Sequence, residues 1–177
     1  PETGVELAED LERIAMNFGG ENIAACIVEP IAGSTGTLVP PKGYLKRLRE
    51  ICDKHGILLI FDEVITGWGR TGSAFAAQEW GVTPDIMTMA KATTNGVVPM
   101  GVVAVKEEMY DTVLDASKAP EGTPELFHGY TYSGIPVAVA AALAVQDIFD
   151  KEDIFKRAKE MSPYFQEGLH SLKDLKE

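Results

Sequence analysis

A strand, a helix and a second strand in close succession constrain the fold of this chain more than any other feature. Residues 23–28 and 57–61 are short apolar runs of the kind that form buried strands. Between them, residues 43–55 carry apolar side chains at a helical spacing, and Gly56 ends that helix. Two strands joined in this way are parallel by default, with a right-handed crossover. The segment therefore predicts an α/β layered domain.

The other predicted elements extend this pattern in part. Helices are expected over residues 5–18, 107–114, 136–149 and 152–173, and strands over residues 85–90 and 101–105. Residues 115–134 hold prolines and glycines without a periodic pattern and predict a loop. No internal repeat or low-complexity segment divides the chain, so its 177 residues fit one domain.

The charge and hydropathy of the chain exclude several classes of protein. A net charge of −11, with only 16 Lys and Arg residues in no dense run, disfavours binding to nucleic acid or to an anionic membrane. The longest apolar stretch, residues 136–145, is far shorter than the ~20 residues of a membrane-spanning helix. The acidic N-terminal sequence does not resemble a signal peptide. We expect Cys26 and Cys52 to be buried free thiols and the protein to be cytoplasmic, because that compartment is reducing.

Two of the predicted strands are each followed by one charged residue. Asp62 comes directly after residues 57–61, and Lys91 directly after residues 85–90. Ligands of parallel sheets bind beyond the carboxyl ends of the strands, where Glu29 would also lie. A carboxylate and an amine on neighbouring strands are what a pyridoxal phosphate site needs. The Lys forms a Schiff base with the aldehyde, and the Asp pairs with the pyridinium nitrogen. Taken singly, a solvated loop carboxylate and a surface amine are the ordinary interpretations of these residues.

The residues that flank Asp62 and Lys91 favour a site over two solvated charges. Val64 could pack its branched side chain on a flat ring, and residues 93–96 turn the chain shortly after Lys91. A Lys held among apolar neighbours has its charged form disfavoured and becomes nucleophilic.

Residues 67–72 match the dinucleotide-binding pattern G-x-G-x-x-G, but their surroundings do not. Five residues separate the first Gly from the strand, and two of them are acidic where a pyrophosphate would have to approach. A loop that needs glycine dihedrals or close packing is the better interpretation.

Residues 129–136, G-Y-T-Y-S-G-I-P, precede the Ala-rich helix, and their Pro suits its first turn. Hydroxyl and amide groups just before a helix N-terminus make an anion site. Simple N-capping by Ser133 explains the motif equally well. The three histidines, His55, His128 and His170, share no ligand spacing, so no metal site is expected.

Together these residues resemble the class III, fold-type I aminotransferases, which use pyridoxal 5′-phosphate. The resemblance covers residues 23–144 and rests on four motifs: L-L-I-F-D-E-V-I-T-G-W-G-R-T-G, P-D-I-M-T-M-A-K, V-E-P-I-A-G-S-T-G and H-G-Y-T-Y-S-G-I-P. It implies a three-layer α/β fold with a parallel or mixed sheet. Residues 1–150 would form part of the large, cofactor-binding domain, and residues 151–177 a helix that leads toward a small domain.

The resemblance also implies roles for four residues. Lys91 would be the Schiff-base lysine and the proton shuttle, and Asp62 the partner of the pyridine nitrogen. Val64 would pack against one face of the cofactor ring. Thr131 is similar to the threonine that reaches the cofactor phosphate of the neighbouring subunit. A homodimer or a larger homo-oligomer, such as a tetramer, is therefore implied.

One departure from the family pattern narrows the reaction. Members that take glutamate as amino donor tend to read E-P-V-Q-G-E where residues 29–34 of this chain read E-P-I-A-G-S. Ala32 replaces the Gln that approaches the phenolic oxygen of the cofactor, and Ser34 replaces the Glu that holds a switching arginine. The pattern is similar to that of the ω-amino acid–pyruvate aminotransferases, such as the β-alanine–pyruvate enzymes. The implied reaction moves an amino group from an ω-amino acid or amine to pyruvate or a similar keto acid.

A second departure concerns length, because family members are much longer chains. This chain begins on Pro rather than Met and is similar to the middle of the enzyme. The Gly/Ser phosphate loop, the ring-stacking aromatic residue and the substrate-carboxylate arginine are therefore expected outside it. An aminomutase, a racemase or a decarboxylase could use the same Lys91 and Asp62. Two further alternatives are a folding unit that does not hold the cofactor alone and, most distantly, a nucleotide-binding module.

Overall fold

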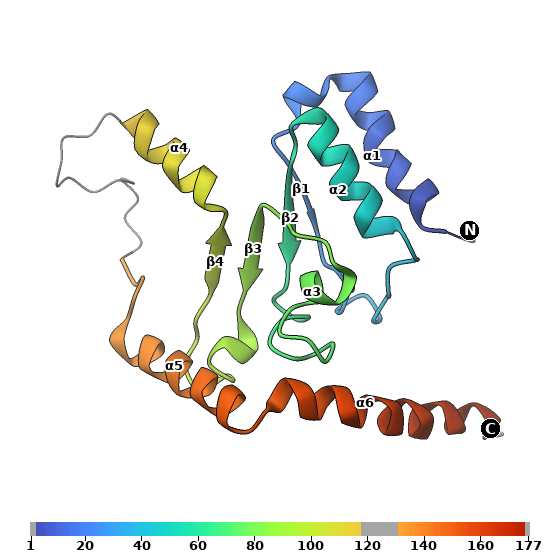
Figure 1. Cartoon of the computed structure of the whole chain (residues 1–177), viewed down its shortest axis with the longest axis vertical. Coiled ribbons are helices and arrows are strands. Elements are labelled where there is room, and N and C mark those ends of the chain that lie inside the picture. Colours follow the sequence, from blue (N-terminus) through green and yellow to red (C-terminus); the bar gives the residue numbers. More distant parts are fainter. Residues whose placement is uncertain (1–2, 118–130, 176–177) are drawn as a thin grey trace.

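Residues 3–117 and 131–175 are described by the computed structural model, and their centre is a mixed four-stranded sheet (Figure 1). In spatial order its strands are Ala25–Val28 (β1), Leu58–Asp62 (β2), Ile86–Met89 (β3) and Val102–Val105 (β4). β1, β2 and β3 run parallel, and β4 pairs antiparallel with β3. The parallel crossover and the α/β class predicted from the sequence are confirmed.

The helices alternate with the strands in the first half of the chain and follow them in the second. They are Val5–Phe18 (α1), Tyr44–His55 (α2), Ala76–Trp80 (α3), Glu107–Ser117 (α4), Pro136–Lys151 (α5) and Ile154–Ser171 (α6), with 3₁₀ turns at Gly20–Asn22 (η1), Lys91–Thr93 (η2) and Leu172–Asp174 (η3). α1 has the predicted bounds, and α4 continues three residues past the predicted end. The remainder of the predicted loop, up to residue 130, lies outside the described residues. Among the described helices, none is long and apolar enough to cross a membrane.

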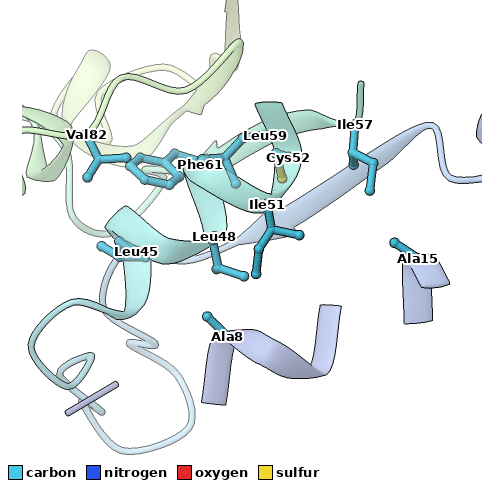
Figure 2. Packing of buried hydrophobic residues seen from close by; sticks show 10 residues of the cluster. All are labelled: Ala8, Ala15, Leu45, Leu48, Ile51, Cys52, Ile57, Leu59, Phe61 and Val82. Carbon is cyan, nitrogen blue, oxygen red and sulfur yellow. The ribbon is translucent and has the colours of Figure 1, made fainter. Parts of the chain in front are cut away.

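The hydrophobic core lies between the sheet and the helices α1 and α2 (Figure 2). Side chains alternate along a strand, so every second residue of β2 points toward α2. Leu59 and Phe61 are fully buried in one cluster with Leu48 and Ile51 of α2, whereas Asp62 is half-buried. Burying an apolar side chain of this size contributes about 1.5–3 kcal/mol. This packing holds β2, and with it Asp62, in place against α2.

The opposite face of the sheet is open in the part of the chain that the structure describes. Ile27 of β1 is 62% exposed and Val103 of β4 is 65% exposed. The prediction that residues 23–28 form a buried strand is therefore wrong for one of its faces. β1 and β4 are the two edges of the described sheet, and no described element packs over these side chains.

A buried carboxylate joins α2, β2 and the end of β4. Asp85 is 8% exposed and accepts hydrogen bonds from Arg49 Nη1 (2.7 Å), Lys106 Nζ (2.6 Å) and the backbone N–H of Leu59 (2.7 Å). Burial alone would raise the pKa of Asp85, but the hydrogen bonds from Lys106, Leu59 and Arg49 outweigh it and lower the pKa below its ordinary value. The backbone N–H of Asp85 also donates to the Leu59 carbonyl (2.8 Å). These bonds fix where β3 begins relative to β2.

A second polar cluster ties α1 to α2. The Glu12 carboxylate is mostly buried and is bonded to Lys54 Nζ (2.5 Å) and His55 Nε2 (3.0 Å). The hydrogen bond from Lys54 is the main reason why the pKa of Glu12 lies below its ordinary value. His55 is the last residue of α2, as predicted.

Both cysteines are free, as predicted. Cys52 is buried, as expected, but Cys26 is only half-buried, so the prediction of a buried thiol is wrong for Cys26. A hydrogen bond from the Cys52 thiol lowers the pKa of Cys26 to about 7. The same contact, together with burial, raises the pKa of Cys52.

Candidate active site

The charged residues that follow the parallel strands lie together at the carboxyl ends of these strands, which we call the carboxyl edge of the sheet. Asp62 is the last residue of β2 and pairs in register with Thr88 of β3. Lys91 comes two residues after the end of β3, in η2. Glu29 follows β1 directly at the same edge. The shared position that the sequence predicted is confirmed.

Asp62 keeps one carboxylate oxygen free. Its Oδ1 accepts the backbone N–H of Val64 (3.0 Å), which turns the chain away from the strand. Within residues 3–117 and 131–175, Oδ2 has no hydrogen-bond partner. Glu29 differs, because its Oε2 accepts the Gly33 N–H (3.0 Å) and closes its own loop. Asp62 therefore offers the more available acceptor at this edge.

Lys91 sits in an unusual backbone conformation with a free amine. Its φ of +47° lies in the left-handed region, which costs a residue with a side chain about 1–2 kcal/mol. Such conformations persist only where neighbouring bonds hold them. Here the N–H of Thr93 donates to the Ala90 carbonyl (3.0 Å), and the N–H of Thr94 to the Lys91 carbonyl (3.3 Å). The Lys91 amine makes no hydrogen bond or ion pair with any described residue.

The surroundings of Lys91 differ from the prediction in one respect. The apolar flanks predicted an enclosed amine, but Lys91 is exposed. The apolar side chain of Met89, which ends β3, is the one that turns into the protein. A free amine and a free carboxylate oxygen at one edge nevertheless suit a ligand that carries an aldehyde and a protonated ring nitrogen.

The glycine-rich loop that follows Asp62 is a packing loop, as predicted. Gly69 and Gly72 have φ values of +90° and +88°, which favour glycine. A Cβ on Gly69 would lie 2.9 Å from Cδ1 of Phe155 in α6. The loop thus lies close against α6 and holds no space for a nucleotide phosphate at Gly69.

Glu63 is a structural residue whose role the sequence did not reveal. It is 0% exposed and accepts Thr66 Oγ1 (2.6 Å) and the backbone N–H groups of Ala76 (2.9 Å) and Ala77 (2.7 Å). Its carboxylate therefore satisfies the open N–H groups at the start of α3, where Phe75 offers no capping oxygen. The sequence signal for this role is a helix start without a capping residue.

Thr131 lines a different part of the surface from Asp62 and Lys91. It is exposed and lines an open pocket of about 500 Å³, together with the segments 99–101 and 132–135 and with Ala138 of α5. Neither Asp62 nor Lys91 lines this pocket. Pro136 begins α5, as predicted, but α5 has no side-chain cap, so the alternative that Ser133 caps it is wrong.

The structure also describes two of the three histidines. His55 contacts Glu12 and His170 lies in α6, whereas His128 lies outside the described residues. Among residues 3–117 and 131–175, no three His, Cys, Asp or Glu side chains gather in a way that could hold a metal ion.

Comparison with known proteins identifies the family of this chain. Residues 2–177 match the model of the class-III aminotransferases. An ω-aminotransferase of Caulobacter vibrioides is 58% identical over 174 residues, which make up 98% of this chain and 39% of that protein. A β-alanine–pyruvate aminotransferase of Pseudomonas aeruginosa is 53% identical over 173 residues, 98% of this chain and 38% of that protein. The chain thus spans less than half the length of these curated relatives.

Solved structures agree with the sequence comparison. An (S)-enantioselective ω-transaminase from Thermomicrobium roseum matches with a TM-score of 0.88 and 43% identity, over 97% of this chain and 37% of that chain. The ω-transaminase of Pseudomonas jessenii in complex with PMP matches with a TM-score of 0.89 and 37% identity, again over 97% and 37% of the two chains. The predicted fold class is confirmed by both. This chain therefore belongs to the class III aminotransferases, a family that depends on pyridoxal 5′-phosphate.

Proposed function

We propose that this chain supplies the lysine and the ring-nitrogen partner of a pyridoxal phosphate site. In our proposal, that site moves amino groups from ω-amino acids or amines to pyruvate or a similar keto acid. The observation that carries the proposal is that Asp62 and Lys91 lie at the same edge of two paired parallel strands, each with a free polar atom. The names of the relatives support the substrate class, and they include an ω-amino acid–pyruvate aminotransferase of Pseudomonas putida at 51% identity.

Each residue has a defined task in this proposal. When bound, pyridoxal phosphate supplies an aldehyde that takes up amines and a ring that accepts electrons. Lys91 is the residue that would hold the cofactor through its aldehyde, and its Nζ would act as the base when it is free. The freed amine then removes the proton from the substrate carbon that bears the nitrogen, a transfer that contributes ~10²–10⁴-fold in rate. Asp62 Oδ2 would accept a hydrogen bond from the protonated ring nitrogen, and Val64 would lie against one face of the ring.

In this proposal Thr131 would bind the phosphate of the cofactor that the neighbouring subunit holds. The active protein would therefore be a homodimer or a larger homo-oligomer. Its exposed position in a pocket at the N-terminus of α5 supports this role, because helix N-termini favour anions. We place the protein in the cytoplasm, in line with its free thiols. Residues 1–150 then belong to the cofactor-binding large domain, and residues 151–177 lead toward a small domain.

The loop after β1 supports pyruvate as the amino acceptor. Ala32 and Leu38 close this loop through two backbone hydrogen bonds of 3.1 and 3.0 Å, and Ser34 lies exposed at its turn. Ser34 carries no charge, so it cannot hold a switching arginine as the glutamate of glutamate-using members does. A donor or acceptor with a single carboxylate then suits the site better than glutamate.

Reductive trapping tests the role of Lys91 directly. The chain is incubated with pyridoxal phosphate and reduced with borohydride, and the modified lysine is located by peptide mass spectrometry. We expect modification at Lys91, its loss in Lys91→Ala, and no change in the control Lys46→Ala, an exposed lysine on α2. Modification spread equally over surface lysines contradicts a specific site.

Activity needs the context of a complete enzyme, and a chimera provides it. This chain replaces the 174 matching residues of the Caulobacter ω-aminotransferase, and alanine formation from β-alanine and pyruvate is measured. We expect turnover by the chimera and none by its Lys91→Ala variant. Turnover of Lys91→Ala at the unaltered rate refutes the proposal. Alanine formation that requires pyruvate also separates transamination from an aminomutase, racemase or decarboxylase reaction.

A further inference from the structure

We propose that Trp68 is a positioning residue for Lys91: its indole N–H holds the turn that presents the Lys91 amine, and its ring couples that turn to the junction of α5 and α6. The proposal rests on the proposed function of Lys91. It concerns a residue of the glycine-rich loop, which the mechanism above does not use.

Two hydrogen bonds link Trp68 to the peptide bond that precedes Lys91. Trp68 Nε1 donates to Thr93 Oγ1 at 3.0 Å, and Thr93 Oγ1 donates to the Ala90 carbonyl at 3.0 Å. The direction of this relay is fixed, because an indole N–H can only donate. Thr93 is 2% exposed, so water does not readily replace the indole.

The relay acts on the bond that sets the direction of Lys91. The Ala90 carbonyl accepts two hydrogen bonds, one from the Thr93 hydroxyl and one from the Thr93 N–H. These bonds fix the peptide plane between Ala90 and Lys91. Lys91 itself is in a left-handed conformation, which is unfavourable unless neighbouring bonds hold it. Loosening the Thr93 hydroxyl therefore allows this plane, and the direction of the Lys91 side chain, to vary.

Trp68 is in turn held by one ring close to it in the chain and one ring far from it. Its ring meets Phe75 edge-on at a centroid distance of 5.1 Å and stacks on Phe149 at 5.9 Å. Phe149 lies near the end of α5 and packs on Phe155 of α6 at 5.2 Å. Figure 1 shows α5 passing beside the turn that follows β3, which agrees with the contact between α5 and η2. A shift of the α5–α6 junction is thus passed to Lys91 through one indole ring.

The first test separates the indole N–H from the indole ring. Trp68→Phe keeps an aromatic ring and removes the donor, and Thr93→Val keeps the shape and removes the hydroxyl. Amide hydrogen exchange of residues 90–96 is measured in the cofactor-free chain. We expect about three- to tenfold faster exchange in both variants, the factor that one neutral hydrogen bond contributes. The double variant should exchange no faster than either single variant, because both remove the same link.

The controls separate positioning from a general loss of packing. Trp80→Phe alters the other tryptophan of the chain and should leave the exchange of residues 90–96 unchanged. Thr93→Ser retains a hydroxyl and should restore the slow exchange that Thr93→Val loses. If Trp68→Phe does not fold, the Thr93 pair carries the test alone. Unchanged exchange in Thr93→Val, or equal acceleration by Trp80→Phe, overturns the proposal.

The second test asks whether the turn matters for the reaction. In the chimera, Trp68→Phe and Thr93→Val should lower kcat about three- to tenfold with little change in KM, since they misplace a reacting group rather than a binding group. An unchanged kcat overturns the positioning role. If the unaltered chimera has no activity and no trapped Lys91, the proposed function fails instead, while the exchange experiment still tests the relay.

Discussion

Replacing Asp85 by Asn is expected to lower the free energy of unfolding of this chain by about 3 kcal/mol. The Asn oxygen can replace Oδ2, which accepts both the Leu59 N–H and Arg49 Nη1, so the loss falls on the charge that strengthens the Arg49 bond and on the Lys106 bond to Oδ1. A hydrogen bond to a charged group contributes about 1.5–3 kcal/mol when it is shielded from water, as the Arg49 bond is. Lys106 is 41% exposed, so its bond is worth less than about 1 kcal/mol. The sum is about 3 kcal/mol.

Urea unfolding followed by circular dichroism measures this change. In a chain of this length, about 3 kcal/mol also lowers the thermal midpoint by about 6–12 °C. Asp53→Asn is the matched control, because Asp53 pairs with the same Arg49 guanidinium at 2.7 Å but is 66% exposed. Asp53→Asn should lower the free energy of unfolding by less than about 1 kcal/mol. Equal losses in the two variants, or a loss below about 1 kcal/mol in Asp85→Asn, refute the reasoning.

The pH dependence gives a second check on Asp85. Its pKa is lower in the folded chain than in the unfolded chain, so its contribution is complete above the unfolded value, ~3.9, and disappears as the pH falls through the folded value. The stability difference between the unaltered chain and Asp85→Asn should therefore be constant from pH 7 to about pH 5. It should narrow only as the pH drops below about 4.

Two further predictions concern the packing loop and the cysteines. Gly69→Ala should lower the free energy of unfolding by about 2–4 kcal/mol, because it adds a left-handed residue and a clash with Phe155. Gly81 also has a positive φ, but no atom of the described residues lies close to the position of its Cβ. Gly81→Ala should therefore lower the free energy of unfolding by only about 1–2 kcal/mol. Equal losses for the two variants in urea unfolding would contradict the clash with Phe155. Alkylation of Cys26 should have its half-maximal rate near pH 7, and Cys52→Ala should move that midpoint upward. A midpoint that Cys52→Ala leaves in place contradicts the thiol–thiol hydrogen bond.

The sequence predicted those parts of the site that depend on local periodicity. Apolar runs with a charged residue at their end placed Asp62 and Lys91 at strand ends, and the parallel rule brought the two ends to one edge. Neither step needs a tertiary contact. The bounds of α1 and the interpretation of residues 67–72 as a packing loop are correct for the same reason, since glycine and helical spacing act within a few residues.

What the sequence did not reveal depends on segments that are distant along the chain. The bond from Trp68 to Thr93 spans 25 positions, and the bonds from Glu63 to α3 span 13 and 14. No periodicity encodes which acceptor a buried indole or carboxylate will meet. The exposure of Lys91 was missed for a related reason. Its neighbours along the chain are apolar, but in the folded chain Lys91 is exposed while Met89 is buried.

The positions of Asp62 and Lys91 along the strand direction depend on the register of β3 against β2, which is fixed at the opposite end of these strands. Asp85 is bonded to Leu59 through both its N–H and its carboxylate, which fixes the register of β3 against β2 at their amino ends. A slip of one residue would move Lys91 by about 3.3 Å along the sheet and exchange the two faces of β3. Because a misplacement of about 1 Å can already cost a hundredfold in rate, the site cannot tolerate that slip. Asp85 is therefore as necessary to the geometry of the site as the turn that follows β3, although it lies at the opposite end of the strand.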